Sequence, residues 1–150
     1  DISFTFGDTE VENEEFVHIG DKAMLAYILK YYDVDKDGKM HINEMKKITT
    51  LTLDFDNIYT YKDGRKVYIS SLDALKNMPN LRSLYLYDNA ASTHNEFRKN
   101  TPSLSFESNP NLNYVLMNRW YVDKLDFGSN SELVTLKIDM REKSGSTMVL

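Results

Sequence analysis

The sequence lacks several features that would assign a protein to a common class. It contains no cysteine, which excludes a disulfide framework and thiol chemistry. No apolar run approaches about 18 residues, so we expect no membrane span. The net charge is −5, and Lys and Arg are not clustered. Nucleic acid is therefore not expected as a partner, because it binds to clustered positive charge.

Linear signatures of catalysis are also missing. The histidines, His18, His41 and His94, have no zinc-binding spacing such as H-E-x-x-H. No G-x-S-x-G elbow, P-loop or G-x-G-x-x-G motif occurs. We therefore expect no enzymatic activity. A small hydrolase is the least favoured alternative, because a site assembled by folding need not leave a linear motif.

An acidic segment, DVDKDGKMHINE at residues 33–44, fits the pattern of a calcium-binding EF-hand loop. Gly38 stands where such a loop turns sharply, and the apolar patterns of residues 21–32 and 42–48 predict a helix on either side. Carboxylates this close repel one another without a cation. The expected Ca²⁺ ligands are the carboxylates of Asp33, Asp35, Asp37 and Glu44 and the backbone carbonyl of Lys39. A single loop predicts weak affinity, about 10⁻⁴ to 10⁻³ M, and the alternative is an acidic turn that binds no ion.

The second half of the chain contains a repeat. Residues 104–117, LSFESNPNLNYVLM, align with residues 125–138, LDFGSNSELVTLKI, at a constant offset of 21 (125 − 104). A Leu-x-x-Leu-x-Leu core also occurs at residues 81–86, and a similar one at residues 48–53. In such a core the last two apolar residues alternate along a strand and face inward, so neighbouring units must stack to bury them. The alternative is a coincidence of leucine-rich strands in another β-rich fold.

The connections between these strands give further expectations. Residues 57–69 alternate around Asp63-Gly64 and predict an inserted β-hairpin. Residues 70–80 predict a short helical or 3₁₀ return. Residues 141–150 predict a hairpin that covers the last sheet edge.

The acidic loop and the repeat together resemble secreted bacterial leucine-rich repeat proteins with an N-terminal EF-hand-like (dockerin-like) calcium loop. The seam between them reads YYDVDKDGKMHINEMKKITTLTL, residues 31–53, followed by ISSLDALKNMPNLRSLYLYDN. The resemblance implies an α/β repeat fold: a short leucine-rich-repeat solenoid with an N-terminal helix–loop–helix cap. The cap would cover residues 1–47, and residues 48–150 would form about four strand units with the inserted hairpin and a C-terminal edge. It also implies a secreted or cell-surface protein whose signal or anchor sequence was removed.

The solvent-facing positions of the expected strands form a candidate binding face for an unidentified protein or surface ligand. Tyrosine is favoured at such surfaces because it adds a large contact area at low entropic cost. The alternative is that exposed tyrosines simply suit a sheet. The face comprises Tyr85, Tyr87, Tyr114, Leu116, Asn118 and Lys137. Trp120 and Tyr121 could add to it, but a tryptophan is more often partly buried by packing. The sequence thus predicts a non-catalytic recognition module with a calcium-stabilised N-terminal cap, or alternatively a calcium-responsive switch that controls partner binding.

Overall fold

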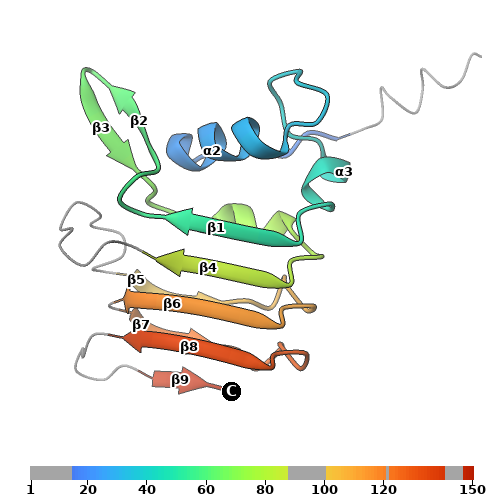
Figure 1. Ribbon diagram of the computed structural model, residues 1–150, viewed down its shortest axis with the longest axis vertical. Helices are drawn as coiled ribbons and strands as arrows, with labels where there is room; N and C mark the ends of the chain where they lie inside the picture. The colour runs from blue at the N-terminus through green and yellow to red at the C-terminus, as the bar shows by residue number, and fades with distance from the viewer. Residues whose placement is uncertain (1–14, 88–100, 121, 141–146) are drawn as a thin grey trace, which may run out of the picture.

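The computed structural model describes residues 15–87, 101–120, 122–140 and 147–150. Two α-helices, α2 (Lys22–Tyr32) and α3 (Ile42–Met45), precede the first strand, β1 (Thr50–Asp54). From β1 onward the described chain is mostly β-structure, stacked in layers from the N-terminal helices to the C-terminal strand (Figure 1). Residues 1–14 of the expected cap and His94 lie outside the described residues.

A parallel sheet of four strands forms one side of the molecule. It runs in the order β1, β4 (Ser83–Tyr87), β6 (Tyr114–Trp120) and β8 (Thr135–Met140). Its register places the apolar residues of the repeat directly opposite one another, in rows such as Leu51, Leu84, Val115 and Leu136. These side chains alternate with solvent-facing residues, because successive positions of a strand point to opposite faces.

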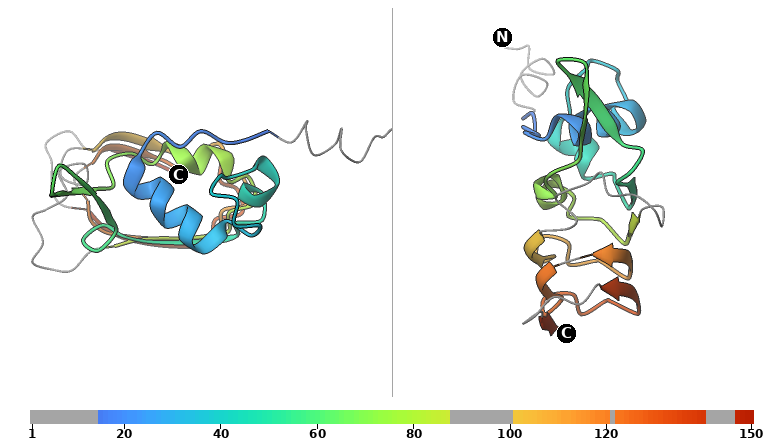
Figure 2. Two further views of the ribbon diagram at one scale, coloured as in Figure 1. Left: turned by 90° about the horizontal axis from the view of Figure 1, so that it is seen from above. Right: turned by 90° about the vertical axis from the view of Figure 1, so that its left-hand side faces the viewer.

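A second parallel sheet lies behind the first (Figure 2). It contains β5 (Thr101–Ser105), β7 (Val122–Asp126) and β9 (Thr147–Val149), with Leu104 opposite Leu125. The core fills the space between the two sheets. Within it the rings of Phe106 and Phe127 stack with centroids 5.2 Å apart.

The segment between β1 and β4 contains an antiparallel hairpin and a 3₁₀ turn. The hairpin pairs β2 (Tyr59–Lys62) with β3 (Arg65–Tyr68), and its turn is at Asp63-Gly64, where the sequence predicts one. The 3₁₀ helix η1 (Asp73–Asn77) follows within residues 70–80. It takes the place on the second side of the molecule that strands occupy in the later layers.

The fold class expected from the sequence is wrong. An α/β repeat requires a helix in each unit, but the only α-helices of the described chain precede β1 and contain 11 and four residues. The later connections are extended and pair with one another as a second parallel sheet. The architecture is therefore mostly parallel β-sheets with two short helices, an α/β-like fold, and not a helix-capped leucine-rich-repeat solenoid.

The expected C-terminal hairpin is also not what the described residues form. The strand β9 pairs with β7 and runs parallel to it, in the second sheet. A hairpin would have placed it antiparallel to the strand before it, because a tight turn reverses the chain direction.

Helix α2 is held on the sheet by polar contacts at both ends. Asp21 caps its N-terminus by accepting from Met24 N–H at 2.9 Å, and the same carboxylate accepts from Ser70 N–H at 2.6 Å. The hydroxyl groups of Tyr27 and Tyr32 donate to backbone carbonyls of β1, at 2.6 and 2.9 Å. Neither helix of the described chain has the length and apolar character needed to cross a membrane.

Candidate functional site

The loop of residues 33–44 folds around its own acidic side chains. The carboxylate of Asp33 accepts from Gly38 N–H at 2.9 Å, and that of Asp37 accepts from Lys39 N–H at 2.9 Å. Two residues take a left-handed backbone, Lys36 with φ of 59° and Gly38 with φ of 81°. Glycine adopts this conformation without steric cost, so its position fits the sharp turn that the sequence predicts.

These turns bring the predicted carboxylates together. Oxygen atoms of Asp33, Asp35 and Asp37 lie within 4.8 Å of one another, a grouping that could hold a metal ion. One oxygen of Asp33, Oδ1, is buried and has no hydrogen-bond partner among the described residues. A buried carboxylate oxygen without a donor is costly, and a cation among the carboxylates would relieve that cost.

Glu44 closes the loop from the buried side. Its Oε2 accepts from Val34 N–H at 2.6 Å and its Oε1 from His41 N–H at 3.0 Å. Glu44 thereby joins the start of the loop to the start of α3. Each carboxylate oxygen retains a further lone pair, so the residue can serve the backbone and a cation together. The predicted ligand Lys39 directs its ammonium elsewhere, over the ring of Phe16 at 4.6 Å from the centroid.

His41 also belongs to the site, and its place in the loop predicts contact with the ion through a water molecule. It is buried, and its Nε2 lies 2.8 Å from Asp37 Oδ2 and 3.6 Å from Asp35 Oδ2. With Asp35 and Glu44 it forms a second grouping that could hold a metal ion. The signal in the sequence is its place at loop position 9, which in EF-hand loops often contacts the ion through a water.

The carboxylates differ in proton affinity. The hydrogen bond from His41 lowers the pKa of Asp37, against a smaller opposing effect of desolvation. The pKa of Asp35 is raised, first by desolvation within the loop and then by the neighbouring acidic groups Asp33, Asp37 and Glu44. A divalent cation would offset the part of this rise in pKa that comes from the acidic neighbours.

The predicted binding face lies on the solvent side of the four-stranded sheet. The register aligns Tyr85 with Leu116 and Leu116 with Lys137, while Tyr114 lies in the adjacent row. The rings of Tyr85 and Tyr114 are 5.1 Å apart, and the ammonium of Lys137 lies 5.9 Å from the Tyr114 centroid. Tyr87 and Asn118 are half-buried on the same strands. The structure therefore brings all six residues onto one surface.

The suggested addition of Trp120 to this face is wrong. Its side chain is fully buried and meets Phe55 edge to face, with ring centroids 5.0 Å apart. A register irregularity between Asn118 and Trp120 in the pairing of β6 with β8 accompanies this change of side. Tyr121 lies outside the described residues.

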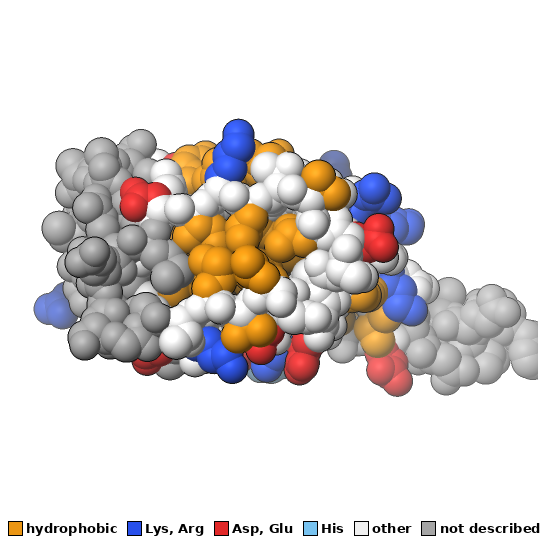
Figure 3. Space-filling model, turned by 90° about the horizontal axis from the view of Figure 1, so that it is seen from below, with side chains coloured by type: hydrophobic (Ala, Val, Ile, Leu, Met, Phe, Trp, Pro, Cys, Tyr) orange, Lys and Arg blue, Asp and Glu red, His pale blue; other side chains and the backbone are white. Residues whose placement is uncertain are grey.

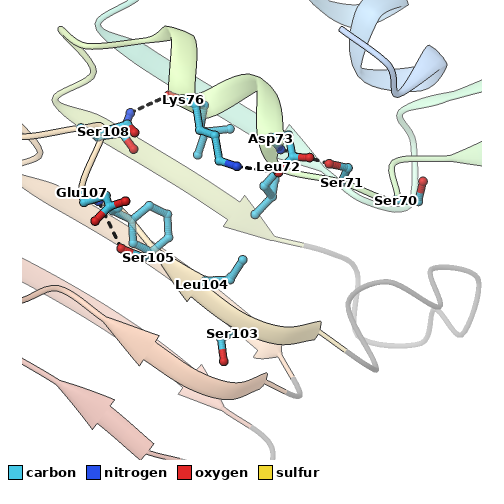
Figure 4. Close-up of a pocket in the computed structure, with 13 residues that line it drawn as sticks. Ser70, Ser71, Leu72, Asp73, Lys76, Ser103, Leu104, Ser105, Glu107 and Ser108 are labelled. Atoms are coloured by element: carbon cyan, nitrogen blue, oxygen red, sulfur yellow. Dashed lines mark hydrogen bonds and ion pairs between the residues drawn. The ribbon is translucent and has the colours of Figure 1, made fainter.

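A hollow of about 410 Å³ lies on the other side of the molecule, between η1 and β5. Figure 4 shows Asp73 and Lys76 on η1 above Ser103, Leu104 and Ser105 of β5. The two charged side chains pair with each other at 3.4 Å. The described lining offers serine hydroxyls but no histidine that could act as their base, so it supplies no argument for the hydrolase alternative.

Comparison with known proteins adds no identification: no family model, curated protein or solved structure matches the chain.

Proposed function

We propose that this chain is a non-catalytic recognition module whose loop of residues 33–44 binds calcium and thereby stabilises the N-terminal elements. The observation that carries the metal assignment is the convergence of Asp33, Asp35 and Asp37 within 4.8 Å, with one oxygen of Asp33 buried and without a donor. Calcium suits the site because the side chains offer mainly oxygen and an irregular geometry, both of which calcium accepts.

The stabilising role follows from where the loop is attached. Asp33 ends α2, and Glu44 lies in α3 immediately before β1. The C-terminal part of the loop also pairs with residues 15–17, where Val17 N–H donates to the carbonyl of Met40 at 2.7 Å. A cation bound to carboxylates along this loop would hold α2 against the first strand and would oppose local unfolding there.

Isothermal titration with CaCl₂ tests the assignment. The wild type is expected to bind one ion with a dissociation constant of about 10⁻⁴ to 10⁻³ M. Asp33→Asn keeps the acceptor for Gly38 N–H but removes a charge, and it should abolish detectable binding. The matched control is Asp63→Asn in the hairpin turn, where a left-handed backbone suits asparagine. Binding of Zn²⁺ with no response to Ca²⁺ would contradict the assignment.

The recognition role is carried by the tyrosine face of the four-stranded sheet. Tyr85 and Tyr114 contact each other beside Lys137, and exposed tyrosines are enriched on surfaces that recognise proteins. The family resemblance, secretion and surface display remain predictions. They agree with a weak calcium site, because extracellular modules bind calcium in this range.

A pull-down from host or bacterial surface extracts tests this face. The variant Tyr85→Ala/Tyr87→Ala/Tyr114→Ala should lose the captured protein. The control Tyr31→Ala/Tyr61→Ala removes two exposed tyrosines from α2 and the hairpin and should retain it. Equal recovery by both variants would exclude the tyrosine face as the binding surface. Circular dichroism verifies that each variant is folded.

A further inference from the structure

The end of the molecule formed by β8 and β9 carries an apolar surface. Figure 3 views this end and shows apolar side chains gathered across it. Val134 and Leu150 are 80% and 81% exposed, and Phe127, Leu133 and Leu136 line a hollow beside Leu150. Within the described chain, β8 and β9 are the outer strands of their sheets at this end. An outer strand offers backbone donors and acceptors to another strand.

The hydrogen bonds of β8 show which of its backbone N–H and C=O groups are available to another strand. Thr135 N–H donates to the carbonyl of Asn113, beside β6. Because backbone groups alternate sides along a strand, those of Lys137 and Asp139 also point toward β6. The N–H and C=O groups of Leu136 and Ile138 therefore point away from the sheet, toward a strand that would pair there.

We propose that a second copy of this chain occupies this edge, with the two β8 strands antiparallel and Ile138 opposite Ile138 of the partner subunit. The argument is charge complementarity. In this register Lys137 lies opposite Asp139 of the partner subunit, and Asp139 lies opposite Lys137 of the partner subunit. Both side chains are exposed on the solvent face of β8, so each can reach across the new edge. These two pairs are of the non-hydrogen-bonded type, whose Cα atoms are about 4.5 Å apart, so the opposite charges lie close.

Neighbouring registers are worse. A shift of two residues places either Lys137 or Asp139 opposite its own copy, and like charges directly opposite destabilise a strand pair. A shift of one residue sets outward-pointing backbone groups against inward-pointing ones and breaks the ladder. Among these neighbouring registers, the sequence T-L-K-I-D-M of β8 therefore favours the pairing centred on Ile138.

The same two-fold arrangement covers the apolar surface. Leu136 and Ile138 are only partly buried in the described structure, and they face the inner side of the sheet. Pairing would continue this inner row across the symmetry axis. The strand β9, with Met148 and Val149 exposed, lies at the same end and would meet its own copy behind β8. An isologous contact of this kind closes as a dimer.

Sedimentation velocity of the 150-residue chain across a concentration series tests the proposal. The wild type should form dimers. In Lys137→Asp, each of the two symmetry-related pairs consists of two acidic residues, so the dimer should weaken about tenfold. Asp139→Lys creates two pairs of lysines and should have a similar effect. The double variant Lys137→Asp/Asp139→Lys restores complementarity and should dimerise as the wild type does. Lys62→Asp, at the hairpin, is the matched control and should have no effect. A wild type that stays monomeric at hundreds of micromolar, or a double variant no better than the single ones, would overturn the proposal.

Disulfide capture gives a second readout that does not depend on charge. The chain has no cysteine, so introduced thiols report only their own proximity. A mixture of Lys137→Cys and Asp139→Cys proteins should form a mixed disulfide on mild oxidation, because these positions face each other at bonding distance. Each variant alone should link far less. Linkage of each variant to itself, without the mixed product, would refute this register.

Discussion

Single polar residues connect the layers of this molecule. Asn109 is buried and donates through Nδ2 to the carbonyls of Leu75 and Met78, at 2.8 and 3.0 Å. Asn130, 21 positions later (130 − 109), donates to the carbonyls of Phe106 and Asn109, each at 2.9 Å. The sequence repeat identifies Asn109 and Asn130 as equivalent positions, because a Ser-Asn pair recurs in both units. Their role was not predictable from the sequence, because it depends on which carbonyls the preceding layer presents.

Replacing Asn109 by alanine should therefore destabilise the fold. The change removes the side-chain donor from two carbonyls, each of which keeps a backbone N–H donor, and should lower the free energy of unfolding by about 1–3 kcal/mol. Urea denaturation measures the effect. Asn111→Ala is the matched control, because that exposed side chain has a single hydrogen bond of 3.4 Å. Equal losses in the two variants would show that the buried amide does not hold the layers together.

Tyr27 makes the attachment of α2 sensitive to alkaline pH. Burial raises the pKa of its phenol to about 12, with smaller contributions from Tyr32, Tyr31 and Tyr87. In the unfolded chain the Tyr27 hydroxyl loses its proton at about pH 10, whereas in the folded chain it keeps the proton until about pH 12. Its contribution to stability is therefore complete below about pH 10 and is lost as the pH rises toward 12.

Tyr27→Phe should remove that part of the alkaline loss. Unfolding free energies measured from about pH 9 to about pH 12 should fall less steeply in the variant than in the wild type. Tyr61→Phe, on the exposed side of the hairpin, should follow the wild-type slope. If the Tyr27→Phe curve also runs parallel to the wild-type curve, Tyr27 does not couple folding to pH.

At the scale of elements, some of the fold follows from the sequence and some does not. The apolar rows of the four-stranded sheet are visible as Leu-x-x-Leu-x-Leu cores, because burial of one sheet face imposes a period of two. The second sheet was missed because its strands bury few residues and show no regular alternation: β7 buries Val122 and Leu125, three positions apart, and all three residues of β9 are exposed. Without a period of two, the sequence does not distinguish these strands from loops.

The acidic loop is the element most completely predicted. The carboxylates of Asp33, Asp35 and Asp37 come together, and the chain turns at Gly38, because the fixed spacing and local side-chain hydrogen bonds determine the turn. The part played by His41 depended on tertiary burial, which spacing does not encode. Whether an ion binds stays a prediction.

Gly38→Ala tests the loop backbone. The residue has φ of 81° with nothing near its missing Cβ, so the cost is one of conformation and not of contact. The variant should lose about 1–2 kcal/mol of stability in chemical denaturation. Gly20→Ala, whose backbone is not left-handed and whose nearest neighbour would be 3.8 Å away, should change stability by less than about 0.5 kcal/mol. Two variants of equal stability would mean that the loop does not hold Gly38 in this conformation.

At the scale of the whole molecule, two parallel sheets enclose one core, and the N-terminal elements lie at the end of the stack opposite β8 and β9 (Figure 1). The helix α2 buries Ala23, Met24 and Ile28 in this core, and polar groups join it to β1 and Ser70 as well. A bound cation at the loop would add to these contacts at the N-terminal end of the stack.

Thermal unfolding of the whole chain in excess calcium and in excess chelator tests this account most directly. With calcium at about one hundred times its dissociation constant, linkage predicts about 2.7 kcal/mol of added stability and a rise in Tm of roughly 5–10 °C. The variant Asp33→Ala/Glu44→Ala should show no difference between the two conditions. A wild type that melts at the same temperature in calcium and in chelator would contradict the claim that calcium stabilises this protein.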